Sequence, residues 1–179
     1  MALIERLHSR PAGRILDFAA GSGRNADALR AAGFTVVAVD DAAAGSRAPL
    51  ADLDGAFDAA ISTHGLLHGT VESIASRVRA IADRLTSRGL FYATFGSTGD
   101  ARFGRGKRID DSTYAPIGGD ERGVAHGYFD RARLCELLSR HFDVESLEEH
   151  RVDRIAGSWA HRAEPLQGAA HWFAIARKR

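Results

Sequence analysis

The stretch Ile15-Leu16-Asp17-Phe18-Ala19-Ala20-Gly21-Ser22-Gly23-Arg24-Asn25 decides how this chain folds. It begins as a short apolar segment, passes through small residues and reaches helical composition at Arg24. Its two glycines allow a tight turn and let a ligand approach the backbone closely. A strand, a glycine-containing turn and a helix in this order predict the start of a nucleotide-type binding sheet.

Strands and helices alternate along the rest of the chain. A helix is expected over 24–32, and the helix capped by Thr70 carries apolar residues at three- and four-residue spacing from Val71 to Leu85. A further helix, capped by Asp130, carries three leucines. Besides 14–18, strands are expected over 34–39, 57–62, 90–95, 142–147 and 171–176. The pattern predicts an α/β fold, a three-layer doubly wound and mostly parallel sheet whose C-terminal strand returns antiparallel.

The composition indicates a single domain over 1–179, with a short N-terminal helix within 1–13 and a lid-like loop over 96–127. Hydrophobic residues make up 45% and charged residues 26%, as in ordinary globular proteins. The 24 basic and 23 acidic residues nearly cancel, which favours a small-molecule ligand over nucleic acid. The lone Cys135 and the absence of an apolar run of about 20 residues predict a cytoplasmic protein without membrane association. The oligomeric state is left open.

The predicted ligand site lies at the carboxyl ends of the strands, beside the first of them. Asp17 and the glycines of the turn stand at the end of the first strand. Asp40 follows the second strand and is placed to accept hydrogen bonds from ribose hydroxyls.

From Ile15 to Asn25 the chain resembles the first motif of class I S-adenosylmethionine-dependent methyltransferases, and the resemblance runs through nearly the whole chain. It implies a Rossmann-like methyltransferase fold with S-adenosylmethionine as cofactor. Asp17 would lie near the methionine amino group, Asp40 would bind the ribose diol and Asp52 would lie near the adenine. The ending 172–179 is most similar to small-molecule methyltransferases, including tellurite-resistance types. The expected cofactor-binding residues are Asp17, Ala19, Gly21, Gly23, Asn25, Asp40, Asp41, Asp52, Ser62, Thr63 and His64.

Two features depart from the family pattern. Ala19 stands where the first glycine of the motif usually stands. Only the segment 41–57 separates Asp40 from Asp58, and relatives place a helix and an entire third strand in that gap. The third-strand region is therefore expected to be shortened or missing.

The expected activity is transfer of a methyl group from S-adenosylmethionine to a small-molecule acceptor. An oxygen or nitrogen acceptor needs a base, and the catalytic candidates are His64, His68 and His126. The basic run 102–108 could bind an anionic acceptor. The expected substrate-binding residues are Arg102, Arg105, Tyr114 and Tyr128.

No metal is expected. His64 and His68 are four residues apart and would share one face of a helix, but no glutamate completes an HExxH motif.

Two alternatives stay open. Gly21 to Ala26 also fits the G-x-G-x-x-A pattern of a nicotinamide-dependent oxidoreductase, although Asp17 would then place a carboxylate near pyrophosphate. The compressed segment 41–57 suggests instead a degenerate, non-catalytic partner protein that binds cofactor poorly.

Overall fold

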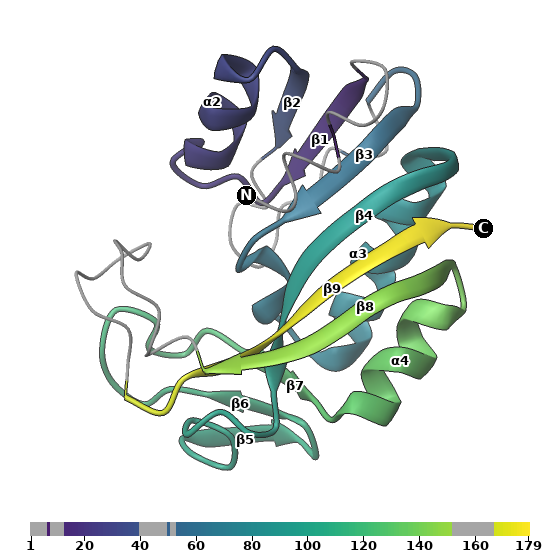
Figure 1. The fold of residues 1–179 in the computed structure, drawn as a ribbon. Helices are drawn as coiled ribbons and strands as arrows, with labels where there is room; N and C mark the ends of the chain where they lie inside the picture. Colours follow the sequence, from purple (N-terminus) through teal and green to yellow (C-terminus); the bar gives the residue numbers. More distant parts are fainter. Residues whose placement is uncertain (1–6, 8–12, 40–49, 51–52, 152–166) are drawn as a thin grey trace.

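The computed structural model describes residues 7, 13–39, 50, 53–151 and 167–179 (Figure 1). Of the expected N-terminal helix over 1–13, it describes Leu7, which is helical and buried, and Gly13. The elements are β1 (Arg14–Phe18), α2 (Arg24–Ala31), β2 (Thr35–Val39), β3 (Phe57–Ser62), η2 (Gly65–Leu67), α3 (Val71–Arg84), β4 (Leu85–Ser97), β5 (Lys107–Asp110), β6 (Thr113–Ala115), β7 (His126–Phe129), α4 (Arg131–Ser139), β8 (Phe142–Arg151) and β9 (Ala170–Lys178).

A mixed sheet runs through the molecule and confirms the predicted architecture. The strands β2, β1, β3 and β4 pair in this order and are all parallel. The strand β9 returns antiparallel between β4 and β8, as the sequence predicts for the C-terminal strand. At its far end β4 also pairs with β7, which continues into the antiparallel strands β6 and β5.

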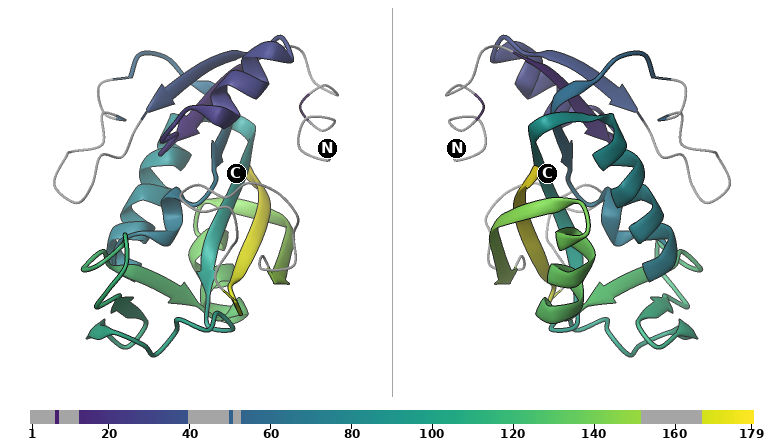
Figure 2. Two further views of the ribbon diagram at one scale, coloured as in Figure 1. Left: turned by 90° about the vertical axis from the view of Figure 1, so that its left-hand side faces the viewer. Right: turned by 90° about the vertical axis from the view of Figure 1, so that its right-hand side faces the viewer.

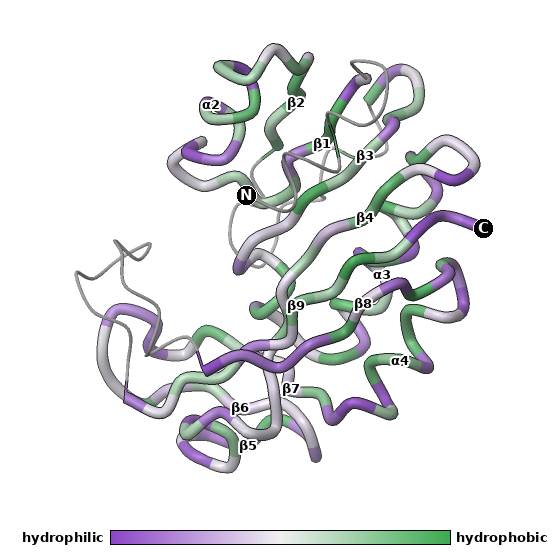
Figure 3. Tube along the Cα trace, viewed as in Figure 1, coloured by the Kyte–Doolittle hydropathy of each residue, from purple (hydrophilic) through white to green (hydrophobic). Residues whose placement is uncertain are grey.

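Helices cover both faces of the sheet, which gives three layers (Figure 2). Leu16 and Phe18 of β1 pack in one apolar core with residues of α3 and α4. Ile15, which lies on the opposite face because side chains alternate along a strand, packs with Ala26 and Leu29 of α2. The strand β8, hydrophilic along much of its length, forms the sheet edge on the far side of β9 (Figure 3).

The opposite edge of the sheet is β2. Among the described residues no strand lies beyond it, and most of the segment 41–57, where the third-strand region is expected to be shortened or missing, lies outside the described residues. From the segment that follows, Leu50 is buried in the core and Leu53 packs against it. Asp40, Asp41 and Asp52 lie outside the described residues.

Two regions differ from the predictions. The helix α3 ends at Arg84, and Leu85 begins β4 because it pairs with Phe57 of the neighbouring strand instead of continuing the helical face. The region 96–127 contains more regular structure than expected, with β5, β6 and the start of β7. These strands are only three or four residues long, which is too short for a periodic signal. They form because β7 pairs with the end of β4, β6 with β7, and β5 with β6.

In the described part of the chain, no helix is both long enough and apolar enough to cross a membrane.

Candidate functional site

Asp17 is a buried carboxylate near the carboxyl end of β1. Its exposed fraction is 1%, and its neighbours in the sheet are Ala38 of β2 and Ile61 of β3. Neither carboxylate oxygen accepts a well-formed hydrogen bond from a described residue. Burial raises the pKa of Asp17 to about 6, and the Ala26 backbone N–H and the Arg30 charge offset part of that rise. A buried, unpaired acid is costly, so this position favours a ligand that brings a cation or N–H donors.

The loop after β1 is shaped by three residues in the left-handed region. Ala19, Gly21 and Gly23 have φ values of 57°, 52° and 77°. A Cβ added at Gly21 or Gly23 would meet no heavy atom within 4 Å, so the loop is open on this side. No side chain caps α2 at Gly23, so the start of this helix can offer backbone N–H groups to a ligand.

A second loop, after β3, forms the adjoining wall. The Asn25 side chain donates to the Thr63 hydroxyl over 2.5 Å, which ties α2 to this loop. Gly65 lies so close to the first loop that an added Cβ would come within 2.3 Å of Ala19 Cβ. Ser62 is fully buried, and its hydroxyl has no partner among the described residues. The two loops therefore form one continuous surface at the carboxyl ends of β1 and β3.

This surface brings together the described members of the expected cofactor site. These are Asp17, Ala19, Gly21, Gly23, Asn25, Ser62, Thr63 and His64. Their roles toward a cofactor stay predictions.

His64 links the cofactor end to a second group of polar side chains. Its backbone N–H donates to the Thr94 hydroxyl over 2.8 Å, and its ring centroid lies 5.4 Å from that of His171. Burial lowers the pKa of His64 to about 4 and that of His171 to about 3. Both imidazoles are therefore neutral near pH 7.

Asp100 is the second buried aspartate, and it is fully partnered. It accepts hydrogen bonds from Arg102 Nε over 3.0 Å and Nη2 over 3.1 Å, and from the backbone N–H of Arg102 and Ala170. Burial alone would raise the pKa of Asp100, but the hydrogen bonds and charge of Arg102 outweigh it and hold the pKa below its usual range. Arg102 Nη2 also lies 3.4 Å from His171 Nε2.

Glu121 lies at the centre of three basic side chains. Its Oε1 is 3.2 Å from His68 Nε2, and its Oε2 is 3.3 Å from His126 Nε2 and 3.7 Å from Arg102 Nη1. The close approach of His126 and His68 holds the pKa of Glu121 well below its usual range. Two of the expected catalytic histidines thus face the same carboxylate.

The expected substrate-binding residues separate into two sets. Tyr114 and Tyr128 both contact Phe103, with ring centroids 5.5 Å apart in each case. Burial raises the pKa of Tyr128 to about 12, and its neighbours include Arg102. The structure therefore brings three of the four together, whereas the Arg105 side chain is exposed and its backbone N–H donates to the Arg102 carbonyl.

Sequence reasoning missed Asp100, Glu121 and His171. Glu121 falls in a turn rich in glycine and charge, and His171 begins a strand whose apolar residues dominate its pattern. Only Asp100, two residues before Arg102, stands near a predicted residue, and that spacing is common on solvated loops. No sequence signal identified these three positions.

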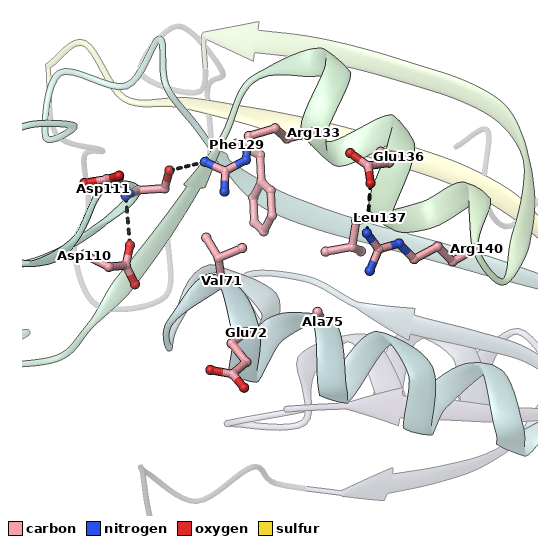
Figure 4. A pocket seen from close by; sticks show the side chains of 11 residues that line it. Val71, Glu72, Ala75, Asp110, Asp111, Phe129, Arg133, Glu136, Leu137 and Arg140 are labelled. Atoms are coloured by element: carbon pink, nitrogen blue, oxygen red, sulfur yellow. Dashed lines mark hydrogen bonds and ion pairs between the residues drawn. The ribbon is translucent and has the colours of Figure 1, made fainter.

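A separate groove lies between α3 and α4, where Arg133 and Arg140 hydrogen-bond to Ser112 and Glu136 respectively (Figure 4). Its volume is about 770 Å³, and none of the expected site residues lines it. Its lining residues are Val71, Glu72, Ala75, Asp110, Asp111, Ser112, Phe129, Arg133, Glu136, Leu137 and Arg140.

Comparison with known proteins finds likeness in structure. No protein-family model and no curated protein sequence matches the chain. A 1,6-didemethyltoxoflavin-N1-methyltransferase from Burkholderia thailandensis has a TM-score of 0.67 at 22% identity, over 99% of this chain and 75% of that one. An S-adenosylmethionine-dependent methyltransferase from Methanosarcina mazei has a TM-score of 0.72 at 15% identity, over 97% and 96% of the two chains.

A third similar structure is TehB from Haemophilus influenzae, a tellurite-resistance methyltransferase. Its TM-score is 0.66 at 13% identity, over 99% of this chain and 62% of that one. The chain therefore has the fold of the class I S-adenosylmethionine-dependent methyltransferases, as its sequence predicts.

Proposed function

We propose that this protein transfers a methyl group from S-adenosylmethionine to a small-molecule acceptor. The observation that carries the proposal is Asp17, a buried carboxylate without a described partner beneath an open glycine loop. Asp17 belongs to a fold that this chain shares with a Burkholderia thailandensis methyltransferase, and the crystal structure of that protein contains S-adenosylhomocysteine. The amino group of the cofactor's methionine part would supply the cation that Asp17 lacks.

The residues around the loop fit such a cofactor. Asp17 would accept hydrogen bonds from the amino group, and the first-turn N–H groups of α2 would face the same end of the ligand. Asp40 would hold the ribose. When bound, S-adenosylmethionine supplies an electrophilic methyl group on a sulfonium, so the protein has chiefly to position the acceptor and exclude water.

His64 is the best-placed base among the three histidine candidates. Its imidazole is neutral near pH 7 because burial lowers its pKa, so one ring nitrogen carries the lone pair that a base needs to accept a proton. His68 and His126 each direct Nε2 toward Glu121, which leaves these atoms less available to an acceptor.

The acceptor side favours a planar small molecule. Arg102 is neutralised by Asp100, so the expected clamp for an anionic acceptor has little free charge. Phe103, Tyr114 and Tyr128 instead bring aromatic rings together beside Arg102. The near balance of acidic and basic residues also argues for a small molecule over nucleic acid, and the single Cys135 for a cytoplasmic location.

Isothermal titration calorimetry with S-adenosylmethionine, S-adenosylhomocysteine and NADPH tests the proposal. We expect the two adenosyl ligands to bind, and Asp17→Asn to weaken S-adenosylmethionine binding by about thirtyfold or more, as for a buried charge contact. The matched control is Asp27→Asn, which removes the same charge from an exposed position on α2 and should leave binding within about twofold. Asp40→Ala should weaken binding by about tenfold if it holds the ribose.

Other outcomes would redirect the proposal. Binding of NADPH alone would indicate a nicotinamide-dependent oxidoreductase. Binding of none of the three ligands would indicate a non-catalytic partner protein. Unchanged affinity in Asp17→Asn would remove Asp17 from the site.

A further inference from the structure

We propose that His68, Glu121 and His126 form a binding site for one divalent transition-metal ion of the zinc type. Each residue offers one ligand atom, and the three atoms all lie within 4.8 Å of one another. Two imidazoles and one carboxylate are a donor set that zinc and its first-row neighbours accept. Mg²⁺ and Ca²⁺ prefer oxygen donors throughout, so two nitrogen ligands disfavour them.

The spacing of the ligand atoms suits tetrahedral coordination. With metal–ligand bonds of about 2.0–2.2 Å, two ligands of a tetrahedral ion lie about 3.3–3.6 Å apart. Glu121 Oε1 lies 3.2 Å from His68 Nε2, and Glu121 Oε2 lies 3.3 Å from His126 Nε2. Whichever of the two oxygens binds the ion, one edge already has nearly this length. The three ligand atoms all lie within 4.8 Å of one another, so the remaining edges have to shorten by at most about 1.5 Å.

The His126 ring is oriented as a metal ligand is. Its Nδ1 lies 2.9 Å from the Val124 carbonyl oxygen, which can only accept, so Nδ1 carries the hydrogen. That leaves Nε2 to point at the Glu121 carboxylate, without a well-formed hydrogen bond, in a side chain that is 3% exposed. A lone pair facing a carboxylate is unfavourable unless a cation lies between them. A metal ion supplies that cation, and the Val124 carbonyl is the outer partner that ligating histidines usually have.

The backbone fixes the two histidines opposite each other. His68 and His126 form an antiparallel bridge, and the N–H of Gly69 donates to the Ala125 carbonyl over 2.7 Å. Residues directly opposite in such a pair project their side chains to the same side. The ring centroids are accordingly 4.9 Å apart in an edge-on arrangement.

The third ligand comes from a closed turn. The N–H of Val124 donates to the Glu121 carbonyl over 3.0 Å, so one turn supplies both the carboxylate and the carbonyl that orients His126. The ligands are thus held by main-chain contacts before any ion binds, which lowers the entropy cost of binding.

The local charge also permits a cation. Arg102 approaches Glu121 to 3.7 Å, but its closer partner is Asp100 at 3.0 Å, and these two charges cancel. Glu121 then leaves the site with one net negative charge. The His68 and Glu121 side chains are 39% and 33% exposed, which gives an ion a path from solvent.

Three protein ligands leave a fourth position open. In zinc proteins, closed four-ligand sites are structural, whereas sites with three protein ligands hold water or a substrate atom at the fourth position. The proposed site is therefore of the open kind. It does not depend on the proposed methyl transfer, because Asp17 and the loop 19–23 contribute no ligand.

No metal is expected from the sequence, where the histidine pair that suggests a site is His64 and His68. His64 has a left-handed backbone and His68 an extended one on either side of η2, so the two do not share a helix face. His68 meets His126 instead, and His64 meets His171. The pairing with His126 joins positions 58 residues apart and leaves no local pattern.

Metal titration of the full-length, tag-free protein after chelator treatment tests the site. We expect Zn²⁺ to bind by calorimetry at one ion per chain, and Co²⁺ to give the visible absorption bands of a tetrahedral site. Loss of an outer partner of a metal ligand costs about ten- to a hundredfold in affinity, so loss of a ligand itself should cost at least about a hundredfold. That loss is expected in Glu121→Gln and His68→Ala, whose side chains are partly exposed and whose replacement leaves the core intact.

The matched control is His150→Ala. His150 Nε2 lies 3.2 Å from Glu148 Oε2, and among the described residues no third ligand atom completes this exposed histidine–glutamate pair, so its loss should leave Zn²⁺ affinity unchanged. Zn²⁺ should also raise the melting temperature of the wild type and the control but not of Glu121→Gln. The proposal is overturned if the wild type binds neither ion at tens of micromolar, or if both ligand variants bind as tightly as the wild type. No step uses S-adenosylmethionine, so failure here would leave the proposed function standing.

Discussion

The two buried aspartates, Asp17 and Asp100, belong to regions of opposite character. Their exposed fractions are 1% and 3%, yet Asp17 lacks a well-formed partner among the described residues, whereas Asp100 accepts from Arg102 and Ala170. Burial therefore raises the pKa of the first, while the Arg102 contacts hold the pKa of the second below its usual range. An aspartate at nearly the same depth therefore stabilises the fold through its partners at Asp100, whereas at Asp17 it is available to bind a ligand.

The N-termini of the helices also differ in whether a side chain of the protein satisfies them. The side chains of Thr70 and Asp130 cap α3 and α4 by accepting from Ser73 and Arg133 respectively. At Gly23, α2 has no side-chain cap. The β1–α2 region thus leaves both a carboxylate and a helix N-terminus for a ligand, whereas Asp100 and the N-termini of α3 and α4 have partners within the protein.

The largest expected effect is on Asp100. Asp100→Asn leaves the Arg102 guanidinium without its buried counter-charge, and we expect the free energy of unfolding to fall by about 3 kcal/mol at pH 7. Urea denaturation measures this loss. The control is Asp143→Asn, an exposed carboxylate that also pairs with arginines, and its unfolding midpoint should hardly change. Equal effects in the two variants would contradict the structural role of Asp100.

Replacing Asp17 should change the free energy of unfolding in the opposite direction. Its pKa rises from 3.8 to about 6 on folding, so its contribution to stability is fully present below pH 3.8 and is lost as the pH rises through about 6. The loss corresponds to about 2–3 kcal/mol. Without ligand, Asp17→Asn should therefore gain stability relative to the wild type between pH 4 and pH 7.

Urea denaturation of the wild type and Asp17→Asn across this pH range measures the difference, and the comparison removes contributions from other titrating groups. Saturating S-adenosylmethionine should abolish the wild-type loss, because Asp17 would then be partnered as Asp100 is. Parallel curves for the two proteins would show that Asp17 is already satisfied.

A substitution that makes the two site loops clash should lower stability more than a substitution that strains the backbone of one loop. In Gly65→Ala the new Cβ would lie 2.3 Å from Ala19 Cβ and 2.8 Å from Ser62 Oγ, and we expect a loss of about 2 kcal/mol. In Gly21→Ala the new Cβ meets nothing within 4 Å, but φ is +52°, so the expected loss is about 1 kcal/mol. Thermal unfolding gives the order, and the reverse order would contradict the close approach of the loops.

The smallest effect is expected at the helix caps. Thr70→Ala removes the hydroxyl that accepts from the Ser73 N–H and should lower the free energy of unfolding by about 1 kcal/mol. Chemical denaturation checks this value, with Ser87→Ala, an exposed strand residue of β4, as the comparison for loss of a hydroxyl. A negligible loss in Thr70→Ala would mean that solvent replaces the cap.

Much of the fold could be predicted because its signals are local. The apolar run before Asp17, the spacing from Val71 to Ile81 and the cap at Thr70 each lie within a few residues, and the structure confirms the strand, the helix and the cap. The loop residues of the expected cofactor site were predicted for the same reason. Leu85 was assigned to the wrong element because its pairing with Phe57 competes with the helical period.

The polar cluster could not be predicted because its members meet only through distant pairing. Glu121, Arg102 and His171 come from a turn, a loop and a late strand. None of them lies within a periodic segment from which its contact with the other two could be predicted. Even the two histidines of the proposed metal site are, from the sequence, only alternative candidates for a catalytic base.

By itself the sequence determined the order of strands and helices outside the region 96–127, the glycine turn after β1 and the acid that opens it, because these depend on short-range propensity and spacing. Only the tertiary structure decided that Asp17 has no well-formed partner among the described residues while Asp100 has several, and that His68 faces His126. Those outcomes depend on which segments pack together and on the water that packing removes, and neither is encoded in any single stretch of the chain.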